Sequence, residues 1–279
     1  MKKKLYRFYM AVIVVLGLPI VFKDYFSRET GRQYRIGLMK KIFFLFRIFR
    51  NTKKVSCASS FAEHLMMITR IFQIPGNIEG VVTEFGCFKG GSTVNLSLAC
   101  RMTGRKLFIF DSFEGLPEPT EKDKKHLVVD DKELHTYAKG AYCGPLELVK
   151  ANISKYGAIE ACNFVKGYFD KTLPSFNEKV VFSFMDVDLL ASLEPCVRRI
   201  WPLMRDGSYL FVHEAHHKEI AELFFNREWW KSNLNSEYPG IVGGGSGLGL
   251  VPYNGGFKSS IGYTIKNPAL DQFTNEEQV

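Results

Sequence analysis

The sequence predicts a doubly wound α/β fold with a mostly parallel sheet, preceded by an N-terminal helical extension. The chain has 279 residues, 46% of them hydrophobic, which is enough for one large α/β domain or two small ones. From Val55 onward, short apolar stretches alternate with stretches of helical character, as is typical of parallel βαβ units. The expected strands are Gly80–Phe85, Lys106–Phe110, Asn163–Lys166, Val180–Met185 and Ser208–Val212, and the expected helices are Phe61–Ile74, Ser92–Met102, Leu146–Tyr156 and Leu193–Met204.

Turn residues separate these elements. The first helix stops at Pro75-Gly76, because proline and glycine interrupt helical periodicity. The first strand then runs through a glycine-containing turn, Gly86–Gly91, directly into the next helix. No internal repeat or long low-complexity tract breaks the alternation, so we expect residues 55–279 to form the main domain.

The positive charge of the chain is confined to its N-terminal part. The formal net charge is +8, but residues 1–54 alone contain fourteen Lys and Arg side chains against Asp24 and Glu29, a net charge of +12. The remaining 225 residues carry 23 basic and 27 acidic side chains, a net charge of −4. A mildly acidic domain lacks the basic surface that binds a phosphate backbone, so we expect no nucleic-acid partner.

An apolar run follows a basic start at the N-terminus. Met1–Arg7 is basic, and Phe8–Phe22 contains fifteen residues without a charge. As a helix this run would span roughly 22 Å, less than the roughly 30 Å hydrocarbon core unless flanking Lys and Arg side chains reach the lipid surface. We expect a membrane anchor, in the form of a transmembrane helix. A cleaved signal peptide, for which no small-residue cleavage site follows Phe22, and a buried or interfacial helix are the alternatives.

The second basic stretch, Arg35–Lys54, has two interpretations. It is either a helix that docks on the main domain or a basic helix that lies at an anionic lipid surface. Together with the apolar run, it predicts that residues 1–54 form a membrane-associated segment that binds lipid. The main domain is then expected on the cytoplasmic side of the membrane.

A glycine turn follows the first predicted strand. Residues 82–92 read VTEFGCFKGGS and lead into a helix N-terminus, where glycines let the backbone approach a ligand closely. The spacing from Gly86 to Gly91 matches a P-loop, but Ser92 stands where the P-loop lysine is required. The GxGxxG dinucleotide fingerprint is absent as well. The turn therefore indicates a cofactor without phosphate.

The second predicted strand ends at Asp111. A carboxylate at this position can accept hydrogen bonds from ribose hydroxyl groups, and a turn or helix N-cap role is the alternative. Glu84 near the end of the first strand and Asp111 at the end of the second lie about 25 residues apart. Together they indicate a ligand that contains ribose.

Four motifs occur in order along the predicted domain. They are Glu84-x-Gly86 with Gly90-Gly91-Ser92, then Asp111-Ser112-Phe113-Glu114-Gly115-Leu116-Pro117, then Lys166-Gly167-Tyr168-Phe169 with Thr172-Leu173-Pro174, and finally Asp186-Val187-Asp188-Leu189. In order and spacing, over roughly Phe61–Val212, they resemble the motifs of the macrocin O-methyltransferase family. The resemblance implies a class I methyltransferase, Rossmann-like fold, S-adenosylmethionine as cofactor, a divalent metal, and methylation of hydroxyl groups on deoxysugars of macrolides and related natural products.

The resemblance also implies roles for individual residues. The methionine and ribose end of the cofactor would contact Thr83, Glu84, Gly86 and Ser92; the ribose and adenine would contact Asp111, Ser112 and Phe113; and the adenine would be covered by Gly167, Tyr168 and Phe169. Asp186 matches the first metal-binding carboxylate of the family.

The chain departs from the family at the other metal ligands. The family has a pair of adjacent aspartates after the next strand, and this chain has His213-Glu214 there. Both side chains are competent ligands, so the resemblance implies a metal site made of Asp186, His213 and Glu214. Mg²⁺ is the expected ion, although an imidazole ligand lowers the preference for magnesium.

Asp186, Asp188 and His213 are the candidate catalytic residues. They follow two late strands, whose carboxyl ends meet at the ligand-binding edge of a parallel sheet. A sugar hydroxyl is a poor nucleophile at neutral pH, so methyl transfer to it needs a base, a metal or both. The alternatives are turn and helix-cap roles for the two aspartates and a polar-loop role for His213.

We therefore expect a metal-assisted, S-adenosylmethionine-dependent O-methyltransferase that acts on a hydroxyl group of a sugar, glycan or secondary metabolite. One alternative is a metal-dependent relative that resembles an oxygenase, because Asp186, His213 and Glu214 could bind iron. The other is a non-catalytic module that binds S-adenosylmethionine. The sequence does not indicate the acceptor or the oligomeric state.

Overall fold

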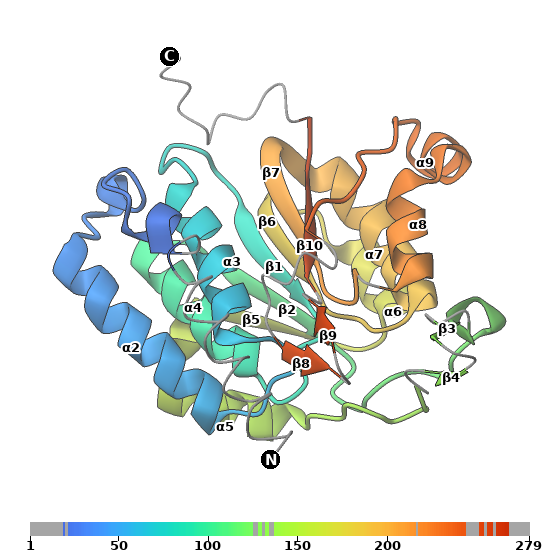
Figure 1. Ribbon diagram of the computed structural model, residues 1–279, viewed down its shortest axis with the longest axis horizontal. Coiled ribbons are helices and arrows are strands. Elements are labelled where there is room, and N and C mark those ends of the chain that lie inside the picture. The colour runs from blue at the N-terminus through green and yellow to red at the C-terminus, as the bar shows by residue number, and fades with distance from the viewer. Residues whose placement is uncertain are drawn as a thin grey trace.

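A central sheet of six strands organises the protein (Figure 1). The computed structural model describes residue 19 and residues 22–124, 128–129, 132–133, 137–215, 217–243, 251–253, 256–258 and 261–267. The strands of the central sheet are β1 (Val81–Phe85), β2 (Leu107–Asp111), β5 (Cys162–Lys166), β6 (Val180–Met185), β7 (Met204–Val212) and β10 (Gly262–Ile265). Two antiparallel pairs lie outside it: β3 (Val128–Val129) with β4 (Lys132–Glu133), and β8 (Val251–Tyr253) with β9 (Gly256–Lys258).

Helices connect these strands. The α-helices are α2 (Leu38–Lys54), α3 (Phe61–Gln73), α4 (Gly91–Thr103), α5 (Leu146–Tyr156), α6 (Phe169–Thr172), α7 (Leu190–Ile200), α8 (Lys218–Phe225) and α9 (Arg227–Leu234). Short 3-10 turns occur at Arg32–Tyr34, Glu121–Lys124, Ile159–Ala161, Leu173–Ser175 and Trp201–Leu203. The strands and helices that the sequence predicts are all present, with ends that differ by a few residues.

The strand order is β10-β7-β6-β1-β2-β5. Neighbouring strands are parallel, except that β10 is antiparallel to β7. The chain passes from β1 outward to β2 and β5, and then returns to β6 on the other side of β1. Doubly wound proteins bind ligands at the carboxyl ends of the strands beside such a switch in direction. The predicted doubly wound, mostly parallel fold is thus confirmed, and the loops after β1 and β6 are where a site is expected.

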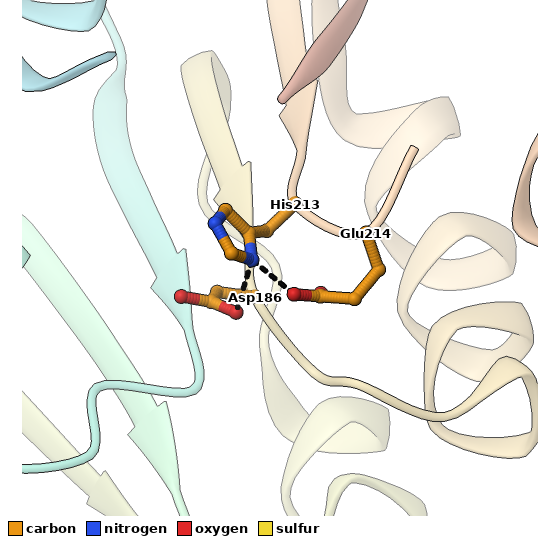
Figure 2. Close-up of side chains that lie close together, drawn as sticks. All are labelled: Asp186, His213 and Glu214. Carbon is orange, nitrogen blue, oxygen red and sulfur yellow. Dashed lines mark hydrogen bonds and ion pairs between the residues drawn. The ribbon is translucent and has the colours of Figure 1, made fainter. Parts of the chain in front are cut away.

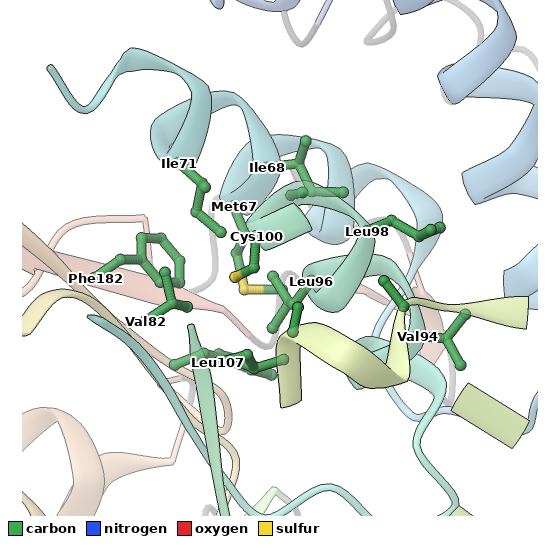
Figure 3. Close-up of a cluster of buried hydrophobic side chains, with 14 of the residues drawn as sticks. Met67, Ile68, Ile71, Val82, Val94, Leu96, Leu98, Cys100, Leu107 and Phe182 are labelled. Carbon is green, nitrogen blue, oxygen red and sulfur yellow. The ribbon is translucent and has the colours of Figure 1, made fainter. Parts of the chain in front are cut away.

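Helices cover both faces of the sheet. Figure 1 shows α2, α3, α4 and α5 on one side and α6, α7, α8 and α9 on the other. Figure 3 shows the first core, in which Met67 of α3 and Leu96 of α4 pack near Val82 and Phe182 of the sheet. The neighbouring Val81 belongs to the second core, because successive strand residues point to opposite faces. Each fully buried apolar side chain contributes about 1.5–3 kcal/mol to this packing.

The segment before Val55 packs on the first core. Tyr25, Phe44 and Ile48 belong to that core, and α2 contacts both α3 and α4. The hydroxyl group of Tyr25 donates a hydrogen bond of 2.9 Å to the carbonyl oxygen of Lys41, which joins the start of α2 to the segment before it. Of the two interpretations of the second basic stretch, the structure has the helix docked on the main domain. The domain boundary at residue 54 stays a prediction.

The expected membrane anchor has to be corrected. Among the residues that the structure describes, no helix combines the length and the apolar character that are needed to cross a membrane. This finding contradicts the expected transmembrane helix and the expected membrane-associated localisation. Most of the apolar run Phe8–Phe22 lies outside the described residues.

The docking of α2 can be tested by comparing two positions on that helix. Ile48 is completely buried, whereas Phe46 is 67% exposed. We predict that Ile48→Ala lowers the free energy of unfolding by about 2–5 kcal/mol, because it leaves a cavity in the core. Phe46→Ala should change it by less than about 0.5 kcal/mol. Urea denaturation followed by circular dichroism measures both free energies. If Ile48→Ala lowered the free energy of unfolding as little as Phe46→Ala, α2 would not be part of the core.

Candidate functional site

A cavity of about 400 Å³ opens at the carboxyl ends of β1, β2, β6 and β7. Most of the residues singled out in the sequence line it: Gly86, Ser92, Asp111, Ser112, Gly167, Tyr168, Phe169, Asp186, Asp188, His213 and Glu214. Thr83, Glu84 and Phe113 do not line it, and each of the three is buried. The fold therefore gathers the four motifs around one cavity, and the roles of the single residues in binding stay predictions.

The turn after β1 depends on glycine. Gly86 has a φ of +76°, and a Cβ atom at this position would lie 1.9 Å from the carbonyl oxygen of Asp186. The turn is thus packed backbone against backbone at the end of β6. Gly90, with a φ of 84°, precedes α4 in the left-handed conformation. The two glycines bring the N-terminus of α4 to the cavity, where its first N–H groups lack partners within the helix.

Asp111 joins two of the loops. Its Oδ2 accepts a hydrogen bond of 2.7 Å from the backbone N–H of Cys87, and its Oδ1 accepts one of 2.7 Å from the N–H of Phe113. A carboxylate has about four acceptor positions, so both oxygens can accept further hydrogen bonds from a ligand. Asp111 therefore has the turn role considered for it and can still bind hydroxyl groups.

Thr83 and Glu84 lie behind the wall of the cavity. The hydroxyl group of Thr83 is 3.0 Å from that of Ser183, and Glu84 accepts a hydrogen bond from the hydroxyl group of Ser92. Burial raises the pKa of Glu84 to about 8, although hydrogen bonds from Ser92 and Thr93 oppose the rise. Glu84 is therefore largely protonated at neutral pH and reaches the cavity only through Ser92.

Asp186, His213 and Glu214 converge at the carboxyl ends of β6 and β7 (Figure 2). The potential ligand atoms of the three side chains lie within 4.8 Å of one another. Nδ1 of His213 is 3.2 Å from Oδ1 of Asp186, and it also contacts Oε1 of Glu214. The backbone N–H of His213 donates to the carbonyl oxygen of Met185 at 2.8 Å, which holds the two strand ends together.

The charges of these three side chains depend on one another. Burial opposes the protonation of His213, but the carboxylates of Asp186 and Glu214 outweigh it and hold the pKa of His213 well above its usual value. Burial raises the pKa of Glu214 to about 7, although His213 opposes the rise. The carboxyl groups of Asp186 and Glu214 thus favour positive charge at the imidazole ring of His213. A cation that replaced the proton on Nδ1 would meet one nitrogen and two oxygen ligands.

Asp188 lies beside this cluster in the cavity. Asp188 and Glu214 have φ values of 60° and 51°, in the left-handed region that side chains with a Cβ rarely adopt. Such strained conformations cluster at functional sites. Burial raises the pKa of Asp188 well above its usual value, and Glu214 and Asp186 raise it further, while a hydrogen bond with Tyr137 opposes the rise.

Aromatic side chains form another part of the cavity lining. The ring of Tyr137 lies 6.3 Å from that of Tyr142 and 6.1 Å from that of His217, and the ring of Phe88 lies 6.0 Å from that of Tyr142. Phe88 lies inside the glycine turn after β1, but its side chain was not expected at the site. Tyr137, Tyr142 and Cys57 belong to no motif, and the only available signal was the pair of tyrosines in a stretch between predicted elements.

Negative charge dominates the cavity. Among the described residues that line it, five have a carboxyl group and none is a lysine or an arginine: the five are Asp111, Asp170, Asp186, Asp188 and Glu214. Carboxylates in a cavity from which water is partly excluded repel one another more strongly than in water. The lining therefore favours ligands that carry positive charge.

The donor set of the Asp186, His213 and Glu214 cluster fits a divalent cation. Carboxylate oxygens suit Mg²⁺ and Mn²⁺, whereas an imidazole nitrogen favours transition metals. His213 and Glu214 are buried and Asp186 is partly exposed, so an ion held by them would face the cavity. The identity of the ion, including the expected Mg²⁺, stays a prediction.

Comparison with known proteins relates the chain to O-methyltransferases. Residues 63–232 match the family described as macrocin-O-methyltransferase (TylF). The chain is 29% identical over 142 residues to the 8-demethyl-8-(2,3-dimethoxy-alpha-L-rhamnosyl)-tetracenomycin-C 4'-O-methyltransferase of Streptomyces olivaceus, which covers 49% of this chain and 53% of that protein. It is 25% identical over 143 residues to the mycinamicin III 3''-O-methyltransferase of Micromonospora griseorubida, with 49% and 56% covered. The chain spans about half the length of these two relatives.

Two solved structures share the fold. The O-methyltransferase NovP superimposes with a TM-score of 0.56 at 16% identity, covering 92% of this chain and 99% of NovP. The calicheamicin methyltransferase CalS11 superimposes with a TM-score of 0.52 at 15% identity, covering 81% of this chain and 92% of CalS11. At this identity the likeness concerns the fold alone. It confirms the predicted class I methyltransferase, Rossmann-like architecture.

Glu84 leads to a prediction about stability. The folded chain holds the proton of Glu84 up to about pH 8, whereas the unfolded chain loses it near the ordinary pKa of 4.5. The contribution of Glu84 to stability therefore falls as the pH rises between these two values. Glu84→Gln removes the titration and can still accept the hydrogen bond from Ser92. We predict that the melting temperature of the variant relative to the wild type is lowest at pH 5 and rises toward pH 8.

Differential scanning calorimetry without added cofactor measures this difference. Glu79→Gln is the matched control, because Glu79 is exposed and lies before β1. The control should show no such rise. A difference between Glu84→Gln and the wild type that stays constant from pH 5 to pH 8 would contradict the raised pKa of Glu84.

Proposed function

The chain belongs to the macrocin-O-methyltransferase family, and from this premise we propose that it transfers a methyl group from S-adenosylmethionine to a hydroxyl group of a sugar, glycan or glycosylated metabolite. The observation that carries the proposal is that the Asp186, His213 and Glu214 cluster lines the same cavity as the glycine turn after β1. Groups that suit the methyl donor and groups that can activate an acceptor thus share one cavity. The name of the Streptomyces relative includes a rhamnosyl group, which supports a sugar hydroxyl as the acceptor.

We place the cofactor along the carboxyl ends of β1 and β2. Gly86 lets the backbone approach the methionine part closely, and Asp111 has acceptor positions left for the ribose hydroxyl groups. Tyr168 and Phe169 follow β5 beside them, where aromatic rings can cover the adenine. The excess of carboxyl groups in the cavity favours the positively charged sulfonium of the methyl donor.

We assign the activation of the acceptor to the ends of β6 and β7. Asp186, His213 and Glu214 would hold a divalent cation, which when bound supplies Lewis-acid stabilisation for negative charge on the acceptor oxygen. Asp188 lies in the same cavity, where its carboxylate form would take the hydroxyl proton, and the hydrogen bond with Tyr137 favours that form. The new C–O bond forms as the C–S bond breaks, so the products are a methyl ether and S-adenosylhomocysteine.

The shared cavity also supports the proposal kinetically. When the methyl donor and the hydroxyl group are held side by side, a reaction between two molecules becomes effectively unimolecular. The partly buried walls exclude water from the sulfonium and strengthen the electrostatic interactions of the carboxyl groups. Both the close placement of the reactants and the exclusion of water follow from the residues that line the cavity.

The role of Asp186 can be tested directly. We predict that Asp186→Asn lowers methyl transfer to a rhamnosylated acceptor about 100-fold or more, because the cation loses a charged ligand. A chelator should lower the wild-type rate similarly, and added Mg²⁺ or Mn²⁺ should restore it. Transfer of a radiolabelled methyl group measures the rate, and calorimetry should show that Asp186→Asn still binds S-adenosylmethionine.

Asp206→Asn provides the matched control, since Asp206 is exposed in β7 and does not line the cavity. Its rate should equal that of the wild type. Full activity in chelator would remove the metal from the mechanism. Full activity of Asp186→Asn would remove the whole cluster from the chemistry.

A further inference from the structure

Nε2 of His213 is a buried polar atom that lacks a hydrogen-bond partner among the described residues. Figure 2 shows that it lies on the side of the imidazole ring that points away from Asp186 and Glu214. Oε1 of Glu63 is a second such atom. His213 is 5% exposed and Glu63 is 0% exposed, so water reaches neither side chain freely. Buried polar atoms without a partner are costly, so each of the two requires an explanation.

Glu63 uses only one of its carboxylate oxygens at the start of α3. Oε2 accepts a hydrogen bond of 2.6 Å from the backbone N–H of Ser60, and the hydroxyl oxygen of Ser60 accepts one of 3.3 Å from the N–H of Glu63. This reciprocal capping box stabilises the first turn of the helix. Oε1 takes no part in it. A glutamine would serve the cap equally well, because the cap needs a single acceptor oxygen.

The packing of α3 places Glu63 near the carboxyl end of β7, where His213 lies. Arg70 lies two turns after Glu63 on the same face of α3, and its guanidinium group is 5.1 Å from the ring centroid of Tyr209 in β7. Arg105, which precedes β2, donates hydrogen bonds to carbonyl groups of the loop after α3, so α3 ends near the amino ends of the strands. The helix therefore runs opposite to β7.

Distances along the two elements agree with this placement. Two turns of helix from Arg70 back to Glu63 cover about 11 Å. The four residues from Tyr209 to His213 at the end of β7 cover about 13 Å. Because the two elements run in opposite directions and touch at Arg70 and Tyr209, Glu63 and His213 lie at the same edge of the sheet.

Electrostatic effects point to the same neighbourhood. Burial raises the pKa of Glu63, and His213 is the strongest influence that opposes this rise. Burial is also the main cause of the raised pKa of Glu214, and Glu63 adds to it. Such mutual effects are typical of charged groups that share one buried region.

We propose that Glu63 is a positioning residue that accepts a hydrogen bond from a water bound to the Nε2–H group of His213, and so holds the imidazole ring with Nδ1 toward the cation. This inference rests on the metal-assisted function proposed above. A cation at Nδ1 leaves the proton on Nε2, so Nε2 remains a donor that needs an acceptor. A carboxylate in this position fixes the ring and makes the ligating nitrogen more basic.

The imidazole ligand explains why such a residue is needed. An aspartate ligand has no N–H group that requires a partner, whereas an imidazole ring has one on its far side. Glu63 therefore serves the histidine specifically. Its contribution should disappear when His213 is replaced by aspartate.

The test measures Co²⁺ binding to the full chain by calorimetry and by visible absorption, which reports on nitrogen ligation. Glu63→Gln is expected to weaken Co²⁺ binding about 10- to 100-fold and to alter the absorption spectrum. In the His213→Asp background the same substitution should change the affinity less than about 3-fold. Ser60→Ala is the matched control, because it weakens the same helix cap and keeps the carboxylate of Glu63. It should lower the melting temperature while leaving Co²⁺ affinity unchanged.

The outcomes separate this inference from the proposed function. If Asp186→Asn abolishes Co²⁺ binding while Glu63→Gln binds as tightly as the wild type, the metal site stands and the role of Glu63 is wrong. Equal losses from Glu63→Gln with and without His213→Asp would also overturn it, because the effect would then not act through the imidazole. If the wild type and Asp186→Asn bind Co²⁺ equally, the metal site itself is wrong and the inference falls with it.

A further variant covers the case in which Glu63→Gln does not fold. Glu63→Asp keeps the charge but retracts the carboxylate by one methylene group, out of reach of the water bound to Nε2. It is expected to weaken Co²⁺ binding about 10-fold or more. Wild-type affinity in Glu63→Asp, with an unchanged absorption spectrum, would overturn the proposed role.

Discussion

Negative charge gathered at one edge of the sheet is the constraint on which the rest of the site depends. Because β1, β2, β6 and β7 are parallel, the acidic residues at their carboxyl ends lie around one cavity. Carboxylates that are partly shielded from water repel one another. Burial raises the pKa of Glu84 to about 8, and the carboxylates of Asp186 and Glu214 hold the pKa of His213 above its usual value against the effect of burial. A sulfonium and a divalent cation would relieve the same repulsion. The crowded carboxyl groups lower the stability of the folded chain, and the same groups favour the binding of its proposed ligands.

Backbone geometry adds to this cost at the same place. Gly86 can pack against the end of β6 only because it has no Cβ atom, and Glu214 adopts a left-handed conformation that a residue with a Cβ atom rarely takes, as does Asp188 at a smaller cost. The capping box at the start of α3 and the hydrogen bonds of Asp111 hold the surrounding loops in place. Strained backbone and buried carboxyl groups therefore occur together at the cavity, while both cores beside the sheet are packed with apolar side chains.

The sequence predicted the central sheet because its inner strands leave a strong local signal. All residues of β1 and β6 are buried, and both strands are rich in valine and phenylalanine (VVTEF and VVFSFM), residue types that favour a buried strand. The antiparallel edge strand β10 was not predicted, because it has only four residues, which is too short for its alternating pattern to stand out in the sequence. For Arg35–Lys54, the sequence could not decide between lipid and protein as the partner of its apolar side chains. The packing of Ile48 in the core decides it.

The site was predictable where its chemistry is local, as in the glycine turn and the acidic residues at strand ends, and hidden where tertiary contacts create it. Tyr137 reaches the cavity from a stretch without a motif, and Glu63 looks like an ordinary helix cap until α3 is placed against β7.

Anomalous X-ray scattering from crystals grown with Mn²⁺ and S-adenosylhomocysteine tests most directly whether the ends of β6 and β7 bind a cation. We expect a peak between Oδ1 of Asp186, Nδ1 of His213 and Oε1 of Glu214. A cofactor-bound crystal with no anomalous peak there, or with one at other residues, would contradict the metal site.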